Sequence, residues 1–203
     1  MYAIVEDNQI TQYVNFPKSV VIGNVRYPAK IFELWSKNEK EAIGIYEIIV
    51  DKTNYKDPAY YNNTDLSYTF ADGKVTESWG TATPKRLEDE NAIDKNDDPI
   101  LDEDGNQVIN YGLKTEKKKI VKQQASALLE KTDWHNHKAL DDNTYTIPEN
   151  VKTYRANVRA KSNEMETQID ACTNVDELKA LYEYTTQKDG TKTRPLAEFP
   201  KEI

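Results

Sequence analysis

A regular pattern of apolar and polar positions between residues 113 and 159 predicts two helices joined by a short polar corner. In the first helix the apolar residues recur every three or four positions, so they share one face. They are Val121, Ala125, Leu128 and Leu129. The sequence Thr132-Asp133-Trp134 ends this pattern, and no further helix is expected before Pro148. Proline suits a first helical turn, because its missing N–H would have no helical partner there.

The second helix and the chain that follows it complete a helical module. Apolar residues of the second helix also lie near one face: Val151, Tyr154, Val158, Met165 and Ile169. A third, short helix is expected after Asn174, whose side chain suits an N-cap. The tail from Lys188 to Ile203 has two prolines and no regular period. It either staples across the helices through Leu196 and Phe199 or frays.

Residues 1–50 show the shorter periods of β-strands. Strands are expected at 2–5 and 10–14, and again at 20–22 and 25–27 on either side of a Gly-Asn turn. Ser36 and Glu39 form a capping-box pattern that opens a short helix. Gly44 ends that helix, and a strand follows at 45–50. Trp35 is expected to pack the helix onto the sheet, because core packing is the commoner use of such a residue.

The stretch from 51 to 83 is rich in aromatic residues. Alternation at 66–70 and 74–79 around Asp72-Gly73 predicts a β-hairpin, because this dipeptide favours the turn that matches strand twist. Four aromatic residues in this stretch are candidates for an exposed partner-binding patch: Tyr55, Tyr60, Tyr61 and Trp79. Exposed aromatic residues suit a protein or glycan partner. The favoured alternative is that these side chains cover a thin sheet.

An acidic segment separates the two halves of the chain. Between Glu88 and Asp104, nine acidic side chains stand against one lysine, a net charge of −8 that equals the total of the chain. A solvated linker is the favoured interpretation, because like charges repel. A calcium loop fails on spacing, because counting from Asp94 puts Pro99 where glycine is needed. Asp104-Gly105-Asn106 predicts a small β-hairpin instead.

Lysines crowd the start of the first long helix, where they oppose its dipole. They are Lys114, Lys117, Lys118, Lys119 and Lys122. Either the helix begins later than the pattern indicates, or the acidic segment folds back to compensate these charges.

These patterns together predict an α+β chain. It has a small antiparallel β-rich region at 1–83, an acidic linker with a hairpin at 84–112, and a module of about three helices at 113–203. The net charge of −8 argues against a nucleic-acid partner, because phosphate contacts need a basic face. No apolar run approaches the roughly 20 residues of a membrane span, and no signal pattern opens the chain. We therefore expect a protein of the cytoplasm without membrane insertion.

The sequence offers no convincing catalytic, cofactor or metal site. His135 and His137 form the only histidine pair, and no third His or Cys lies nearby to complete a zinc site. Glycine-rich phosphate loops and hydrolase or metalloprotease motifs are absent from the sequence. The single Cys172 has no adjacent base and is expected to be a buried structural thiol. We therefore expect a non-enzymatic protein that needs no cofactor and no metal.

Two stretches resemble bacteriophage tail fibre assembly proteins and related phage tail proteins. The first comprises Gly112-Leu113-Lys114, Gln124-Ala125, Leu128-Leu129-x-x-Thr132-Asp133-Trp134 and Ile147-Pro148-x-x-Val151-x-x-Tyr154-Arg155-x-x-Val158-Arg159. The second, similar to their N-terminal segment, comprises Tyr27-Pro28-Ala29 and Glu39-x-x-Ala42-Ile43-Gly44-Ile45-Tyr46-Glu47. The middle third of the chain lies outside the resemblance.

The resemblance implies structural roles for the residues of the corner. Leu128 and Leu129 would belong to the core, and Trp134 would close the corner over them. Asp133 would cap backbone donors at the turn. Pro148 would open the second helix, and Tyr154 and Arg155 would fix that helix against the corner.

The resemblance also implies a function and a partner. The protein would assist the folding or assembly of trimeric tail fibres or cap their ends, with a tail fibre protein or another tail component as its partner. A homo-oligomer or an assembly with the symmetry of the fibre fits this role. Its place would be the host cytoplasm during assembly, with retention in the virion tail for a permanent component. Two alternatives are a permanent structural component of the virion and a tip that binds host-surface glycans through its tyrosines.

Overall fold

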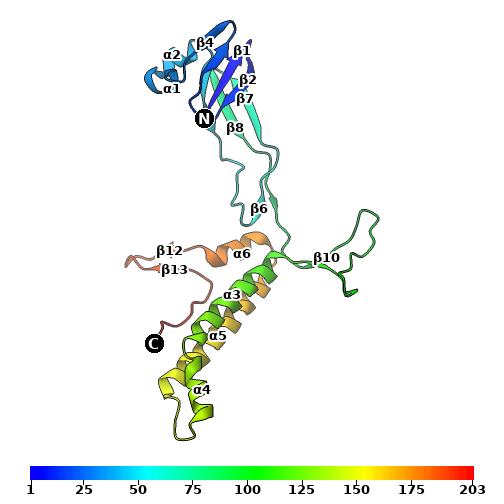
Figure 1. Ribbon diagram of the computed structural model, residues 1–203, viewed down its shortest axis with the longest axis vertical. Helices are drawn as coiled ribbons and strands as arrows, with labels where there is room; N and C mark the ends of the chain where they lie inside the picture. Colours follow the sequence, from blue (N-terminus) through cyan, green and yellow to red (C-terminus); the bar gives the residue numbers. More distant parts are fainter. The chain divides into compact units, whose positions relative to one another are not determined.

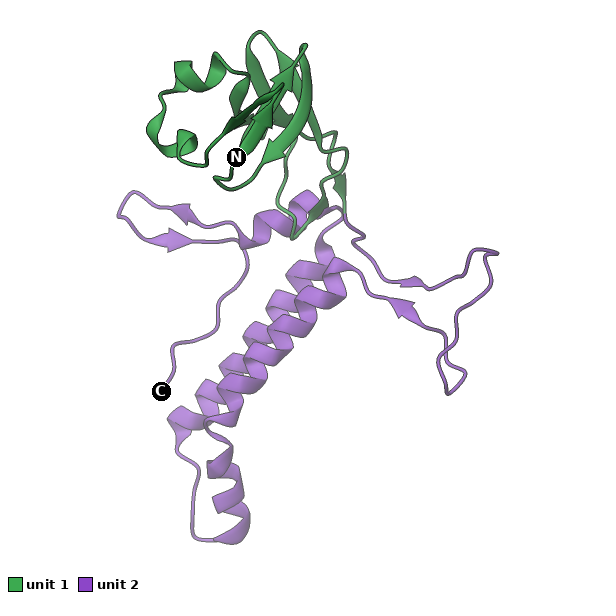
Figure 2. Ribbon diagram, turned by 45° about the horizontal axis from the view of Figure 1, so that its top comes forward, with its two compact units in different colours: residues 1–84 green, residues 85–203 purple.

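The computed structural model describes residues 1–203, and the contacts within the chain divide it into two compact units, Met1–Pro84 and Lys85–Ile203 (Figures 1 and 2). Strands dominate the first unit and helices the second, which confirms the predicted α+β class. None of the helices combines the length and the apolar composition needed to cross a bilayer.

A five-stranded sheet forms the centre of the first unit, in the order β2-β1-β5-β8-β7. Neighbouring strands are antiparallel except for β5 and β8, which are parallel, so the predicted antiparallel arrangement is wrong for this one pair. A parallel pair needs a long crossover, and the stretch from 51 to 73 provides it. The strands are β1 (Tyr2–Glu6), β2 (Gln9–Val14), β5 (Ile45–Val50), β7 (Ser67–Ala71) and β8 (Lys74–Ser78).

Two tight turns fix the register of this sheet. Asp7 and Asn8 join β1 to β2 with φ values of 50° and 62°, and Asp72 and Gly73 join β7 to β8 with values of 51° and 68°. Positive φ at both central residues is the turn geometry that matches the twist of a hairpin. The hairpin predicted around Asp72-Gly73 is therefore confirmed.

One face of the sheet is covered by a short hairpin and two short helices. Ile4, Val14 and Ile45 on this face pack with residues from the cover, including Val20, Ile31 and Phe32. The predicted capping box is present, since the Ser36 and Glu39 side chains bond each other's backbone N–H groups. Trp35 packs against the same cluster, as expected. The covering elements are β3 (Val20–Ile22), β4 (Val25–Tyr27), α1 (Ile31–Leu34) and α2 (Lys37–Glu41).

The opposite face of the sheet is filled by side chains of the sheet itself. Ala3, Val5, Ile48 and Val75 form its buried cluster. Aromatic rings lie around this cluster, with Tyr46 against Phe70 and Tyr13 against Tyr68, each pair at 4.8 Å between centroids. The second ring pair brings the two edge strands β2 and β7 near each other, although no ladder joins them.

Two long helices, α3 (Leu113–Glu130) and α5 (Glu149–Ala171), pack side by side in the second unit (Figure 1). The start of α3 contacts the end of α5 and the reverse, so the pair is antiparallel. The module also contains α4 (Asp133–Asp141) and α6 (Val175–Tyr182), so it has four helices where about three were expected. The prediction of no helix between 132 and Pro148 is wrong. The α4 helix buries no residue, so it lacks the apolar stripe on which the prediction depended.

The tail of the chain staples across the helices. The Leu196 side chain is 2% exposed, and its backbone N–H donates to the Leu181 carbonyl at 3.0 Å. Gln168 bonds the tail at two points, Pro195 and Ala197. Phe199 then packs in the cluster around Tyr154. Of the two alternatives for the tail, the structure has the staple. Before it lie two short strands, β12 (Thr185–Thr186) and β13 (Lys192–Thr193).

The acidic segment forms two loops built on the same plan. Asp94 Oδ1 accepts from the N–H groups of Asn96 and Asp98, and Asp102 Oδ1 accepts from those of Asp104 and Asn106. The predicted small hairpin is present as the second loop, closed by the Leu101–Gln107 bridge. The remaining short strands of the chain are β6 (Tyr61–Asn62), β9 (Thr83–Pro84), β10 (Glu90–Asn91) and β11 (Ile109–Asn110).

Candidate partner-binding surfaces

Arg155 lies at the centre of the corner formed by α3, α4 and α5. Its Nη1 donates to the Leu129 carbonyl at 2.8 Å and to Thr132 Oγ1 at 2.7 Å, and its Nη2 lies 2.8 Å from Asp133 Oδ1. The guanidinium is largely buried, and its planar fork can serve several acceptors at once. One side chain of α5 therefore holds the end of α3 and the start of α4.

Beside Arg155, Tyr154 belongs to the apolar contact between the two long helices. It packs with Ala125 and Val158, and Leu128, Leu129 and Phe199 border the cluster. The hydroxyl of Tyr154 is buried and has no hydrogen-bond partner. The two leucines are thus partly buried at the border of this cluster, and Tyr154 places an unpaired polar atom within it.

Trp134 does not close the corner, and this expectation is wrong. Its side chain is 53% exposed and stacks on His135 at 3.7 Å between centroids. Trp134 stands in the first turn of α4 and is not among the residues that pack with Leu128 and Leu129 around Tyr154. His135 in turn bonds the Tyr145 hydroxyl through Nδ1, a contact that the sequence pattern did not indicate.

Asp133 also differs from expectation, whereas Pro148 opens the second helix as expected. Asp133 does not cap the turn, because its carboxylate forms the ion pair with Arg155 and no side-chain cap bond opens α4. Pro148 stands one residue before α5, at the N-cap position, with a φ of −56°. Pro148, Trp134 and His135 line a shallow hollow of about 360 Å³ at this end of the module.

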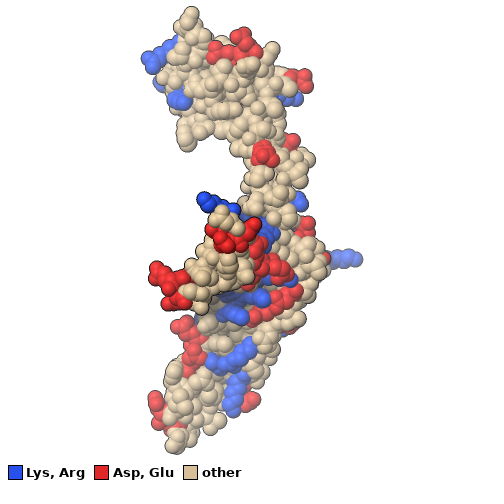
Figure 3. All heavy atoms as spheres, turned by 90° about the vertical axis from the view of Figure 1, so that its right-hand side faces the viewer, with Lys and Arg blue, Asp and Glu red and all other residues tan.

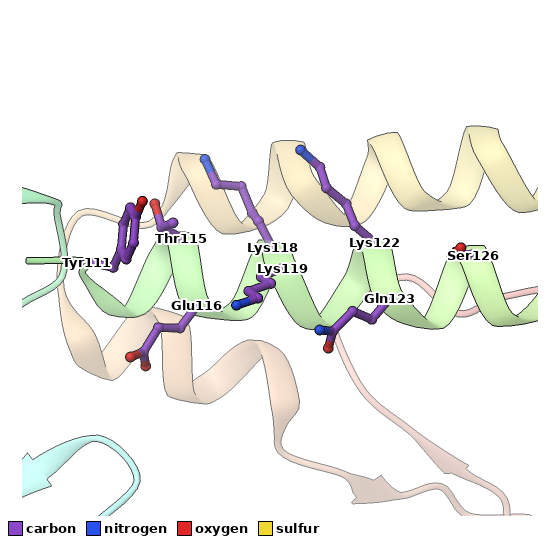
Figure 4. A pocket seen from close by; sticks show the side chains of 8 residues that line it. All are labelled: Tyr111, Thr115, Glu116, Lys118, Lys119, Lys122, Gln123 and Ser126. Carbon is purple, nitrogen blue, oxygen red and sulfur yellow. The ribbon is translucent and has the colours of Figure 1, made fainter. Parts of the chain in front are cut away.

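Lysines at the start of α3 bind acceptors at the C-terminal end of the neighbouring helix, α5. Lys114 Nζ donates to the Asp170 carbonyl at 3.0 Å, and Lys118 Nζ lies 2.7 Å from Asp170 Oδ1. Lys122 pairs with Glu166, and Figure 4 shows Lys118 and Lys122 extending from α3 toward α5. The hydrogen bond to Asp170 raises the pKa of Lys118. These cations oppose the dipole of α3 but complement the negative end of antiparallel α5.

The start of α3 is stabilised by the beginning of the acidic segment. Asp89 accepts from the Gly112 N–H at 2.8 Å and from Thr115 Oγ1 at 2.9 Å, and Glu88 pairs with Lys114. A Cβ on Gly112 would lie 2.4 Å from the Glu88 carbonyl, so only glycine allows this approach. The expected fold-back therefore occurs for Glu88 and Asp89, while the two loops beyond them bond within themselves.

Charges of both signs lie side by side on the helical unit (Figure 3). A hollow of about 780 Å³ follows the outer face of α3, between Tyr111 and Ser126 (Figure 4). Its lining contains Lys118, Lys119 and Lys122, two of which are already paired with α5. The hollow is open, and it holds no cluster of catalytic groups.

Of the four aromatic candidates in the first unit, one is exposed, one is partly buried and two are buried. Tyr55 is 38% exposed and meets Trp79 edge-on at 4.9 Å between ring centroids, and Trp79 is partly buried. Tyr60 and Tyr61 are 6% and 4% exposed, so the expectation of one exposed patch is wrong for them. Part of the Tyr61 ring lies under Lys56, whose Nζ is 4.3 Å from the ring centroid.

The carboxylates of Asp94 and Asp102 accept hydrogen bonds from backbone N–H groups of their own loops. These hydrogen bonds, led by those from Asn96 and Asn106, lower the pKa of Asp94 and of Asp102. No group of three or more His, Cys, Asp or Glu side chains is arranged to hold a metal ion. Cys172 is buried, and burial raises the pKa of its thiol.

Comparison with known proteins adds no relative: no family model matches the chain, and no curated protein or solved structure is significantly similar to it.

Proposed function

We propose that this chain is a non-enzymatic bacteriophage tail protein that associates with tail fibres and assists their folding and assembly or caps them. The observation that carries the proposal is the corner of the helical module. Motif residues far apart in the chain meet there, where Arg155 bonds Leu129, Thr132 and Asp133. A motif whose members contact one another supports the resemblance to tail fibre assembly proteins more strongly than scattered matches would.

The physical task of such a protein also fits the first unit. A fibre chain exposes apolar surface and strand edges until trimerisation covers them, and these surfaces aggregate. A partner with a β-sheet and aromatic side chains near its rim can shield them in the meantime. We place the fibre contact in residues 1–83, where the sheet, Tyr55 and Trp79 lie.

Co-expression with the tail fibre of the same phage tests the proposal. The full chain should increase the yield of soluble, trimeric fibre and should co-purify with it. Residues 1–83 alone should retain the contact, whereas residues 113–203 should not. Fibre that reaches the same yield of trimer without the chain, and never co-purifies with it, would refute the proposal.

Proteomics of purified virions separates a transient assembly factor from a permanent structural component. A chain that is present in fixed proportion to the fibre is a component of the tail, and a chain that is absent acts during assembly alone. A glycan-binding tip is the weaker alternative, because the buried Tyr60 and Tyr61 leave it fewer exposed rings.

A further inference from the structure

The two edge strands of the five-stranded sheet carry little protection of their own against pairing with another chain. Natural edge strands usually carry charges, proline or a bulge that discourage such pairing. In a chain of which 31% of the residues are charged, neither β2 nor β7 contains a charged residue or a proline. The β2 strand has one register shift, and the ladder of β7 with β8 has none. The β7 edge is therefore the one that most needs protection from outside the strand.

The two edges face each other across a narrow seam. The Cα atoms of β2 and β7 approach within 8 Å, and Tyr13 of β2 packs on Tyr68 of β7 at 4.8 Å between ring centroids. Paired strands lie about 4.8 Å apart, so a strand inserted between two others needs about 9.6 Å between them. The seam is therefore too narrow for a strand of another chain, although β2 and β7 form no ladder with each other.

The two tyrosines of the seam have different surroundings. Tyr68 lies opposite Glu77 in the ladder of β7 with β8, and burial, together with a hydrogen bond to Glu77, raises the pKa of its hydroxyl. Tyr68 also packs against the buried cluster around Val75, together with Ile10 of β2. Tyr13 is 44% exposed and is not among the residues that pack against this cluster. Its ring therefore contributes to the contact between the edges more than to the core.

We propose that the contact between Tyr13 and Tyr68 is autoinhibitory, in that it holds the edges of β2 and β7 against each other and prevents both from pairing with strands of other chains. Closing a sheet on itself is the most complete way to remove its edges. Here side chains make the closure, because no ladder joins the two strands. Edges protected in this way need neither charge nor proline, which accounts for the absence of both from β2 and β7. The inference concerns the first unit and does not depend on the proposed function.

Removal of the Tyr13 ring from the full chain tests the inference. Tyr13→Thr keeps a residue that favours strands and removes little of the core, because the Tyr13 side chain is 44% exposed. At concentrations where the unmodified chain keeps a constant mass, the variant should self-associate, and its mean mass in analytical ultracentrifugation should at least double as the concentration is raised. Tyr55→Thr is the matched control, because Tyr55 is 38% exposed and packs edge-on against Trp79, outside both edge strands. Its mass should stay constant.

A second substitution separates strand pairing from partial unfolding. Thr69 is exposed on β7, and a charge on an edge strand discourages pairing. Thr69→Lys added to Tyr13→Thr should therefore restore the constant mass of the unmodified chain. Self-association that persists in the double variant, or that Tyr55→Thr shows equally, overturns the inference, and so does a Tyr13→Thr variant of constant mass. Loss of the thermal transition of the first unit in Tyr13→Thr also overturns it, because the core would then need the ring. The proposed function stands in each case.

Discussion

Arg155 shows how one residue can join three helices. Its guanidinium is largely buried, and its acceptors come from the last turn of α3, the connecting residue Thr132 and the first residue of α4. Removing one partner of such a contact leaves the others buried without a hydrogen bond.

Arg155→Lys keeps the charge but loses the fork that reaches several acceptors. We expect it to lower the free energy of unfolding by about 2 kcal/mol, below the range for fully buried pairs because Asp133 is partly exposed. Chemical denaturation measures this. Arg159→Lys is the matched control, because Arg159 bonds one carbonyl of its own helix, and a loss equal to that of Arg155→Lys would contradict the argument.

Tyr154 is a residue whose polar atom brings no benefit to the fold. Its hydroxyl is buried without a partner, and such a group costs free energy. Tyr154→Phe should therefore leave the free energy of unfolding unchanged or raise it by up to about 1 kcal/mol. Tyr154→Ala, which also removes the ring from the cluster with Val158, should cost about 3–5 kcal/mol. A clear loss of stability in Tyr154→Phe would show that the hydroxyl has a partner in solution.

At the scale of elements, the sequence predicted the helices and strands that have a regular apolar period or a recognisable turn or cap. The hairpin at Asp72-Gly73, the capping box at Ser36 and the two long helices follow from local chemistry, and the structure contains them. The α4 helix was missed because it buries no residue and is held by the Trp134–His135–Tyr145 stack, which no periodicity reveals.

The candidate site was less predictable than the fold. The burial of Tyr60 and Tyr61 and the parallel pairing of β5 with β8 depend on contacts between distant segments. The role of the α3 lysines was obscured for the same reason, because their partners Glu166 and Asp170 lie on another helix. The sequence pattern predicted α3 and its lysines. Only the antiparallel packing of α3 on α5 explains why the lysines lie at the start of α3.

The stability of the two acidic loops should depend on pH. Backbone hydrogen bonds lower the pKa of Asp94 and Asp102, so the ionised forms stabilise the loops. A carboxylate with a lowered pKa contributes its stabilisation above its unfolded value of about 3.9 and loses it as pH falls through the folded value. NMR titration should place both carboxyls below that value, and the loops should loosen only at more acidic pH. In Asp94→Asn, which keeps an acceptor oxygen without the charge, the first loop should lose this dependence.

At the scale of the whole molecule, each compact unit contains a core of its own. The clusters around Ile4 and Val75 lie within Met1–Pro84, and the cluster around Val158 lies within Lys85–Ile203. We expect residues 1–84 and 85–203, expressed separately, to fold and to unfold cooperatively. Circular dichroism against temperature measures this. If one fragment melts sharply and the other shows no thermal transition, the fragment without a transition needs the rest of the chain in order to fold.

The two acidic loops share a neck in which three backbone positions bond in a cycle. Ile100 donates to Ala92, Val108 donates to Ile100, and Ala92 donates to Val108, while the side-chain amide of Gln107 bonds the carbonyls of all three. Each loop leaves the neck and returns to it after eight residues, from 92 to 100 and from 100 to 108. The segment is thus modular. Deletion of residues 93–100 would remove the first loop and join Ala92 to Leu101, and the bond between Ala92 and Val108 would still close the neck of the second loop. Evolution can lengthen or shorten this arm in whole loops while both folded units stay unchanged.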